Sequence, residues 1–327
     1  MQWEGGKAEV STQGKYEIIH AAIQRDNNLL SIAKLCEIAG VSRSGYYAWV
    51  GAAPLRKERD SADQKDFDVI LDAYKFRGYA KGARGIYMRL LHKGKIMNIK
   101  KIRRLMKKYG LKCPYRGPNP YRQMAKAIKT NAVFPNKVNR KFVDGGVRKV
   151  LLTDITYIFY DGGVCYLSTI LDAFTREILA YELSTNLMVE FVLKTVDKLI
   201  SEHGSTLDDT TIVHSDQGCH YTSKAFIQKL KDNDFIQSMS RRGNCWDNAP
   251  QESFFGHMKD EIKYEIAMMK SFDDVRAKLD DWIDYYNNDR YQWELAKLSP
   301  KEFYQYTTTG IYPITVPSRG AAPNPEV

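Results

Sequence analysis

The chain has 327 residues, of which 43% are hydrophobic, so it can hold two or three domains and bury a sizeable core. It contains no apolar run of about 18 residues and no N-terminal signal peptide, which argues against a membrane-spanning or secreted protein. Five scattered cysteines and six histidines show no paired spacing, which argues against a disulfide framework or a zinc site.

Charge is distributed unevenly along the chain. The net charge of +10 is the balance of +18 over residues 1–145 and −8 over the remainder. Residues 73–143 contain no Asp or Glu at all. Because a solvated surface normally mixes both signs, we interpret this segment as a nucleic-acid-binding region, with a solvated basic face as the alternative.

The first elements indicate a small helical module. Residues 1–14 are polar and are expected to be poorly ordered, and a helix is expected over residues 15–25. In residues 31–49, Ser31 and Ser42 are suited to cap two helices around a turn at Gly40 and Val41. This is the outline of a helix-turn-helix, with Ser42, Arg43 and Ser44 as the candidates for DNA contact and a plain helical hairpin as the alternative.

A second, strongly basic helical region follows. Pro54 and the charged run after it predict a hinge, and residues 61–74 predict a helix. Two short helices closed by Gly94 and Gly110 come next, and they resemble a second helix-turn-helix. The second of these helices should turn its basic residues outward as candidate DNA contacts: Lys100, Lys101, Arg103, Arg104, Lys107 and Lys108. Residues 115–139, with three prolines, predict an extended linker that could lie along DNA.

From Lys149 onward the pattern changes to strands. Three β-branched and aromatic segments predict three antiparallel strands, followed by a helix over residues 187–203. A short strand ending before Asp216, a helix from Ser223, a fifth strand and a last helix complete the series. This order predicts an RNase H-like core: an α/β fold with a mixed five-stranded sheet and helices.

The last helix of this series carries a carboxylate and an ammonium on one face. Asp247 and Asn248 before Pro250 indicate where it begins. Lys259 lies seven residues after Glu252, so the two side chains share a face two turns apart, and an ordinary solvated ion pair is the alternative reading.

Two further carboxylates are expected near Glu252. Asp154 lies inside a strand with apolar neighbours, where an unpaired charge is costly. Asp216 follows the fourth strand, where an ordinary turn residue is the alternative. In the predicted topology the first and fourth strands are neighbours, so the three carboxylates would meet. Such hard oxygen donors suit two Mg²⁺ or Mn²⁺ ions and phosphoryl chemistry.

Several motifs resemble one family. The motifs TDITYI, HSDQGCHYTS, CWDNAPQESFFGHMK and DYYNNDRYQWELAKLSP, with LCEIAGVSRSGYYAW upstream, are similar to the OrfB transposase of the IS-three insertion-sequence family, one of the DDE integrases and transposases. The resemblance covers about residues 15–305. It implies that Asp154, Asp216 and Glu252 are the catalytic metal ligands and that Lys259 holds DNA near the cut.

The resemblance also implies how the protein acts. The expected activity is metal-dependent cleavage and joining of element ends, in the bacterial cytoplasm and at the nucleoid. Expected partners are the element's terminal repeats, target DNA, a second copy or more of the chain on DNA, and an upstream-frame helix-turn-helix and zipper protein or fusion. The sequence has no zipper heptads and no zinc-binding His/His/Cys/Cys domain. His214 and His220 flank Asp216, and a structural role is the stronger alternative for both.

The C-terminal region is expected to be helical and then disordered. Ser271 begins a helix whose apolar stripe should pack on the core, with a second protomer as the alternative, and the Pro/Gly-rich tail from Ile311 is expected to be disordered. The alternative function is a DNA-binding repressor with an inert integrase core; an RNase H-type hydrolase would leave the basic front half without a role. The expected division of the chain is 1–14, 15–53, 60–114, 115–145, 146–265, 266–309 and 310–327.

Overall fold

The computed structural model describes residues 10–25, 27–114, 134–241 and 245–314. The chain divides into two compact units, Met1–Val69 and Ile70–Val327, and the boundary falls inside helix α4 (Ala53–Lys75). No described helix has both the length and the apolar character needed to cross a membrane.

The first unit contains the helix-turn-helix outline that the sequence predicts. Ser31 caps α2 (Ile32–Ala39), Gly40 ends it in the left-handed conformation, and Ser42 caps α3 (Arg43–Gly51). Helix α1 (Thr12–Ile23) begins earlier than expected, because the Ser11 side chain accepts a hydrogen bond from the Gly14 backbone. Residues 10–14 are therefore largely helical rather than poorly ordered, and residues 1–9 lie outside the described residues.

The hinge predicted at Pro54 is wrong in position. The break between α3 and α4 lies at Ala52, and the charged run Arg56–Asp60 lies inside α4. Proline is tolerated in the first turn of a helix because the backbone N–H that it lacks would have no partner there. The predicted helix over residues 61–74 is thus the second half of one 23-residue helix.

The two short basic helices form as predicted. They are α5 (Ala83–His92) and α6 (Ile99–Lys108), preceded by the 3-10 turn η1 (Phe76–Gly78). Gly94 and Gly110 follow them with φ near +67° and +68°, the conformation in which glycine is least strained. Ile102, Leu105 and Met106 are buried on the inner face of α6.

The second unit is built around a five-stranded mixed sheet. The strand order is β3-β2-β1-β4-β5, with β1 antiparallel to β2 and parallel to β4. The neighbouring first and fourth strands are as predicted, and the expected RNase H-like α/β fold is confirmed. The strands are β1 (Val150–Tyr160), β2 (Gly163–Asp172), β3 (Ile178–Ser184), β4 (Ile212–Ser215) and β5 (Ile236–Met239).

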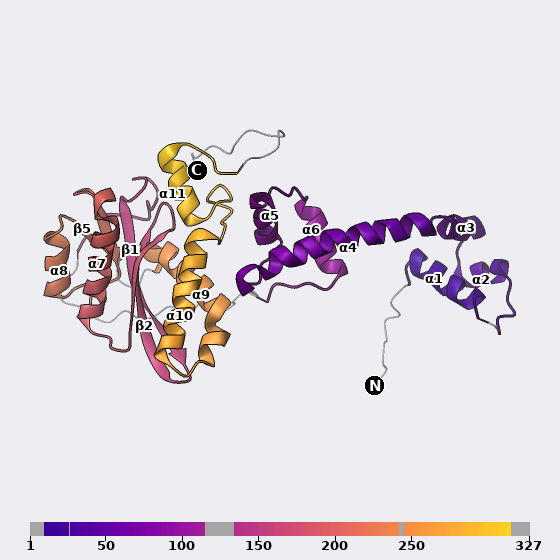
Figure 1. The fold of residues 1–327 in the computed structure, drawn as a ribbon, viewed down its shortest axis with the longest axis horizontal. Helices are drawn as coiled ribbons and strands as arrows, with labels where there is room; N and C mark the ends of the chain where they lie inside the picture. Colours follow the sequence, from indigo (N-terminus) through magenta and orange to yellow (C-terminus); the bar gives the residue numbers. More distant parts are fainter. Residues whose placement is uncertain (1–9, 26, 115–133, 242–244, 315–327) are drawn as a thin grey trace. The chain divides into compact units, whose positions relative to one another are not determined.

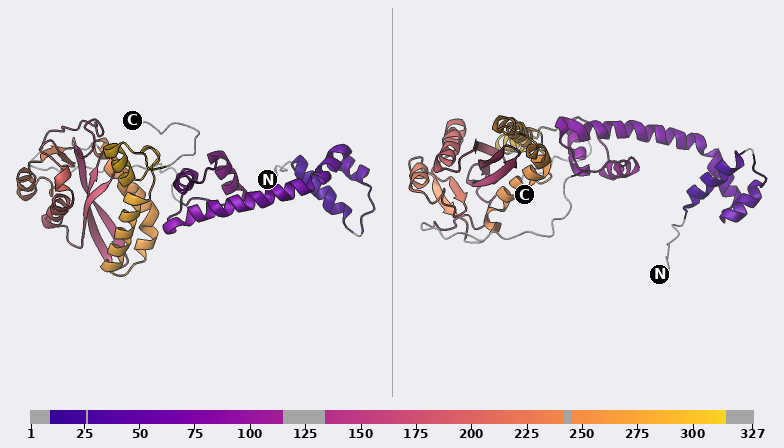
Figure 2. Two further views of the ribbon diagram at one scale, coloured as in Figure 1. Left: turned by 45° about the horizontal axis from the view of Figure 1, so that its top comes forward. Right: turned by 90° about the horizontal axis from the view of Figure 1, so that it is seen from below.

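Helices cover both faces of this sheet, as Figure 1 shows and Figure 2 repeats from two other directions. Alternating residues of β1 point to opposite sides: Leu151 packs with α7 and α8, and Leu152 packs with α9 and α10. The helices and short turns of this unit are α7 (Val189–His203), η2 (Gly204–Thr206), α8 (Lys224–Lys231), η3 (Cys245–Asn248), α9 (Ala249–Ala267), α10 (Phe272–Asn288) and α11 (Pro300–Thr309).

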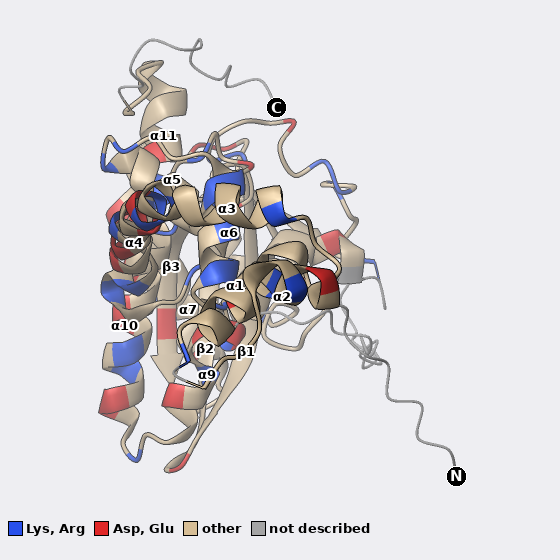
Figure 3. Cartoon of the chain, turned by 90° about the vertical axis from the view of Figure 1, so that its right-hand side faces the viewer, with Lys and Arg blue, Asp and Glu red and all other residues tan. Residues whose placement is uncertain are grey.

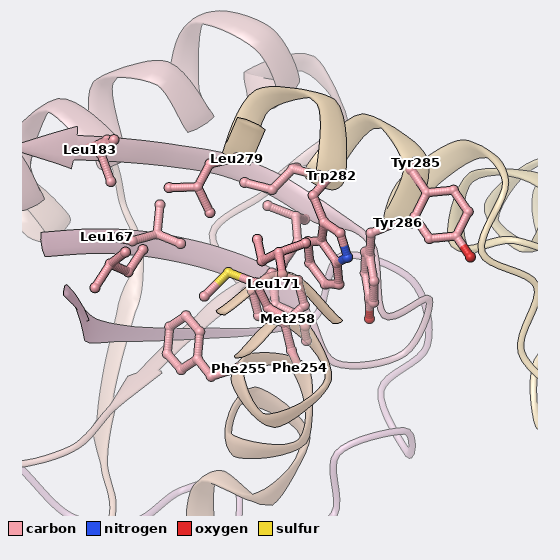
Figure 4. Close-up of a cluster of buried hydrophobic side chains, with 14 of the residues drawn as sticks. Leu167, Leu171, Leu183, Phe254, Phe255, Met258, Leu279, Trp282, Tyr285 and Tyr286 are labelled. Carbon is pink, nitrogen blue, oxygen red and sulfur yellow. The ribbon is translucent and has the colours of Figure 1, made fainter. Parts of the chain in front are cut away.

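The core between the sheet and the last helices fixes the position of α9. Phe254, Phe255 and Met258 of α9 pack with Trp282 and Tyr286 of α10, as Figure 4 shows. Trp282 is fully buried and its indole N–H donates to Glu261 at 3.0 Å. The predicted packing of the α10 stripe on the core is confirmed, and the apolar residues of α9 pack in the same core, which holds α9 against β1.

Two segments expected to be loose are packed instead. Of the predicted linker, residues 115–133 lie outside the described residues, but Val138 is buried in the core and Asn136 donates to Asp247 at 2.9 Å. Of the predicted tail, Ile314 is buried and the Tyr312 hydroxyl donates to the Ala296 carbonyl, while residues 315–327 lie outside the described residues. Apolar burial anchors both segments despite their polar or Pro-rich neighbours.

Within the second unit, ion pairs attach the segment before α5, which includes η1, to α10. The Arg77 guanidinium donates to Asp281 at 2.7 Å, to Asp284 at 2.8 Å and to Asp289 at 2.9 Å. The Tyr79 hydroxyl also donates to Asp281, and its ring stacks on Tyr285. Figure 3 colours the charged residues of α10 and α6. Acidic residues at α10 thus neutralise part of the positive charge of residues 73–143, the segment that has no Asp or Glu.

Candidate active site

Asp154 lies on β1 just beyond the point where β4 stops pairing with it. The paired residues of β1 end at Leu152, so Asp154 stands at an open stretch of the strand edge. Its carboxylate accepts the Ile155 backbone N–H at 2.7 Å. Burial raises the pKa of Asp154 to about 8, and the nearby carboxylates of Asp216 and Glu252 add to this rise.

Asp216 follows the last residue of β4 and is held by its own loop. Its Oδ1 atom accepts the Gly218 backbone N–H at 2.8 Å, and a Cβ on Gly218 would lie only 2.8 Å from the same oxygen. The residue is exposed, yet desolvation of its carboxylate raises the pKa of Asp216. Glycine at position 218 therefore lets the loop close tightly around this side chain.

Glu252 and Lys259 reach the same region from α9. Glu252 lies in the first turn, where the partial positive charge of the helix end favours an anion. Desolvation lowers the pKa of the Lys259 ammonium, and the charge of Asp154 opposes that shift. The structure thus brings Asp216, Glu252 and Lys259 within electrostatic reach of Asp154, and the four side chains come from three separate elements.

The carboxylates are suited to a divalent cation by their chemistry. Their mutual repulsion, seen in the raised pKa of Asp154, is what a bound cation would relieve. Hard oxygen donors fit Mg²⁺ or Mn²⁺. Among the described residues, however, no three or more His, Cys, Asp or Glu side chains are already grouped to hold a metal ion. The side chains would have to converge further on binding.

Asn248 is a site residue that the sequence pattern does not identify. In the sequence it signals only the start of α9, but its side chain is buried and its Nδ2 donates to Asp154 Oδ2 at 3.4 Å. Its Oδ1 is buried without a hydrogen-bond partner. The signal that could have found it is its position four residues, about one helical turn, before Glu252.

The neighbouring Asp247 ties together three parts of the site. Its fully buried carboxylate accepts from Arg241 at 2.8 and 2.9 Å, from Arg140 at 3.0 Å and from Asn136. The two guanidinium groups, Arg241 first, hold the pKa of Asp247 well below its usual range. Asp247 thereby fixes the end of the linker and the start of α9 to the core.

The two histidines beside Asp216 have structural partners. His214 is fully buried between the hydroxyls of Ser238 and Ser240, at 2.9 and 3.1 Å, and burial lowers its pKa to about 4. His220 contacts the Leu187 carbonyl through Nε2 at 3.2 Å. These contacts support the structural role for both histidines.

The candidate DNA-contact residues lie on exposed helix faces. Ser42, Arg43 and Ser44 are exposed at the start of α3 in the first unit. In α6, Lys101 is half-buried, and the other five candidates are exposed opposite the buried stripe: Lys100, Arg103, Arg104, Lys107 and Lys108. These residues are separate from the carboxylate site in sequence, and their roles stay predictions.

Comparisons with known proteins identify the domains of this chain. Two models described as an integrase core domain match residues 146–245 and 233–300, and one described as an HTH-like domain matches residues 61–119. The chain is 31% identical to "Putative transposase InsK for insertion sequence element IS150" of Escherichia coli (strain K12), over 84% of this chain and 93% of that protein.

Other relatives carry similar names. "Transposase InsF for insertion sequence IS3A" of the same strain is 27% identical, over 86% of this chain and 96% of that protein. Among solved structures, the catalytic core domain of HTLV-2 integrase in complex with magnesium covers 48% of this chain and 95% of that chain, with 13% identity and a TM-score of 0.36. With its integrase core and its extended similarity to these relatives, the chain belongs to the OrfB-type transposases of the IS-three insertion-sequence family.

Proposed function

We propose that this transposase binds the ends of its element and catalyses divalent-metal-dependent strand cleavage and strand transfer. The observation that carries the proposal is the grouping of Asp154 on β1, Asp216 just after β4 and Glu252 in the first turn of α9, together with the raised pKa of the desolvated Asp154 carboxylate. Such a group costs free energy in the unliganded protein, and perturbed carboxylates of this kind are typical of functional sites.

In this proposal each side chain has one task. Asp154, Asp216 and Glu252 would hold two Mg²⁺ or Mn²⁺ ions, which when bound would activate a water or 3′-hydroxyl and stabilise the leaving 3′-oxygen of an in-line displacement. Asn248 steadies Asp154 through its amide N–H. Lys259 holds a DNA phosphate beside the cut by charge.

The proposed DNA contacts are the helix-turn-helix residues and the basic face of α6. Residues 42–44 at the start of α3 and the outward lysines and arginines of α6 would bind phosphates of the element ends. In this proposal at least two copies of the chain act on the two ends, and an upstream-frame protein adds end recognition.

The test is cleavage and joining of a labelled duplex carrying the element's own ends, with Mg²⁺ or Mn²⁺. We expect wild type to cut and Glu252→Gln to bind without cutting, since the amide cannot supply the anionic oxygen. Glu265→Gln, on an exposed part of the same helix, is the matched control and should cut like wild type.

Lys259→Ala tests the second role in the same assay. It should weaken cleavage more than overall DNA binding, because it removes one phosphate contact at the cut. Equal losses of cleavage and binding would contradict that role. If Glu252→Gln cuts as well as wild type, the carboxylate mechanism is wrong.

A further inference from the structure

An aromatic and cationic surface lies where α5 packs against the loop between α10 and α11, both within the second unit. Trp293 of that loop is 41% exposed. The Arg84 guanidinium of α5 lies 5.4 Å from the centre of the Trp293 ring, and the Lys297 ammonium lies 5.3 Å from it. The Tyr87 ring of α5, 6.1 Å away, completes what we call the Trp293 cluster. None of its four residues lies on an element that carries a carboxylate of the candidate active site.

The loop that carries Trp293 and Lys297 is held in one conformation. Leu295 and Leu298 are buried, and the Leu298 backbone N–H donates to the Leu295 carbonyl at 2.9 Å. Lys297 has a φ of 68°, which is uncommon for a residue other than glycine and costs free energy. Such a backbone conformation persists only where the surrounding packing determines it. The loop therefore presents the Lys297 ammonium at a fixed place beside the ring.

The two cations of the Trp293 cluster lack the acidic partners that a neighbouring basic residue has. Arg89, on the same helix as Arg84, forms an ion pair with Asp289 at 3.6 Å. Within the described part of the chain, neither Arg84 nor Lys297 forms an ion pair. Glu294 lies in the same loop and pairs with neither of them. Because an exposed surface normally mixes both signs, two uncompensated cations at one place indicate an anionic ligand.

The chemistry of the cluster fits a DNA backbone. Most contacts of a DNA-binding protein are made to phosphates and sugars, and arginine and lysine supply the cations. Arg84 and Lys297 lie beside the same ring, so both can reach neighbouring phosphates of one strand. Their contact with the ring limits the motion of two long side chains before any ligand arrives, which lowers the entropy cost of binding. The exposed part of Trp293 adds an apolar surface for a sugar.

We propose that the Trp293 cluster binds the phosphate backbone of duplex DNA, in addition to the basic face of α6. Arg84 and Tyr87 belong to the segment that matches the HTH-like domain, whereas Trp293 and Lys297 belong to a segment that matches the integrase core domain. The contact therefore forms only where these two parts of the chain pack together. The inference rests on the proposed DNA binding and adds that a loop of the core shares in holding the DNA.

The test measures how DNA affinity depends on salt, with the full chain. Binding of a labelled duplex that carries an element end is followed by fluorescence anisotropy in EDTA, so that no cleavage intervenes. Arg84→Gln combined with Lys297→Gln removes both charges and keeps polar side chains that can lie on the ring. We expect the slope of log affinity against log salt to fall by up to about 2, close to one unit for each phosphate that is no longer neutralised. A duplex of unrelated sequence should show the same fall, since phosphates carry no sequence information.

Three further variants separate charge from packing. Arg84→Lys with Lys297→Arg keeps both charges and should keep the slope. Trp293→Leu keeps the charges but removes the ring that orders them, so it should weaken binding about two- to fivefold without changing the slope. The matched control is Lys224→Gln with Lys231→Gln, which removes two exposed charges from α8 and should leave the slope unchanged.

An unchanged slope in the variant with both glutamines at positions 84 and 297 would overturn the proposal, as would an equal fall in the α8 control. A merely structural contact would lower the thermal unfolding midpoint of that variant and leave the slope at the wild-type value. If the slope stays and the mass measured by light scattering without DNA changes, the cluster is a protein-protein surface. The proposed function fails or stands separately, because Glu252→Gln should lose cleavage and keep the wild-type slope.

Discussion

At the scale of single residues, the dominant feature of the site is the Asp154 carboxylate, whose desolvation on folding costs free energy. Burial and two neighbouring carboxylates raise the pKa of Asp154 to about 8, whereas an unfolded aspartate has a pKa of about 3.9. Between these values the folded protein keeps the proton and the unfolded protein loses it. Stability therefore falls as pH rises through this window.

Replacing Asp154 should consequently stabilise the metal-free protein. In EDTA at neutral pH, Asp154→Asn is expected to raise the free energy of unfolding by about 2 kcal/mol, since the amide carries no charge to desolvate. Urea denaturation of both proteins from pH 4 to pH 8 measures this difference, which should grow steadily with pH. A difference that does not change with pH would contradict the electrostatic cause.

Asp247 and Asn248 have side-chain partners that the local sequence does not predict. From the sequence, both are good helix-start residues, and that prediction is correct in position. Their actual partners, Arg140, Arg241 and Asp154, are up to 107 residues away in the chain. Local propensity cannot identify such partners, because tertiary packing alone brings them together.

At the scale of elements, the turn between β1 and β2 packs against the connection from α9 to α10. The Asp161 backbone N–H donates to the Met269 carbonyl at 2.9 Å. A Cβ on Gly162 would meet the Lys270 carbonyl oxygen and the Tyr160 ring far inside contact distance. Glycine is required there by the approach of two backbones, which the turn sequence does not reveal.

Two glycine substitutions should therefore change the free energy of unfolding in opposite directions. Gly162→Ala is expected to lower the free energy of unfolding by about 1–3 kcal/mol, because backbone atoms must move to admit the methyl group. Gly256→Ala, inside α9 with open space around the added methyl, should raise it by about 0.8–1 kcal/mol. Thermal unfolding of both variants checks this, and destabilisation by both would show that α9 has no room for the added methyl.

At the scale of the whole molecule, the two halves of the sequence have net charges of opposite sign. The first 145 residues carry +18 and the remainder −8. Part of the positive charge is compensated within the fold, as at Arg77, but α6 has no acidic residue of its own to offset its exposed basic face. Phosphate binding by such a face makes affinity depend on salt.

Substitutions of basic residues in α6 should therefore alter the salt dependence of DNA affinity. Arg103→Ala with Arg104→Ala is expected to reduce the slope of log affinity against log salt by up to about 2, close to one unit for each phosphate that is no longer neutralised. The matched control is Lys231→Ala at the exposed end of α8, which should leave the slope unchanged. An unchanged slope in the double variant would remove α6 from the DNA interface.

Sequence alone determined the elements, their order and the candidate carboxylates. Hydrophobic periodicity, serine caps and glycine stops are local signals, so the strands, α2, α3, α5, α6 and α9 lie close to where the sequence predicts them. The motif spacing around Asp154, Asp216 and Glu252 is likewise readable, because strand and helix ends fix where those side chains can lie.

Only the tertiary structure decided what surrounds those carboxylates. The continuous α4 through Pro54, the burial of Val138 and Ile314, the ion pairs of Asp247 and the Trp293 cluster all depend on contacts between residues distant in sequence. Burial, desolvation and the early end of β4 arise from packing the whole chain, and no local pattern encodes them.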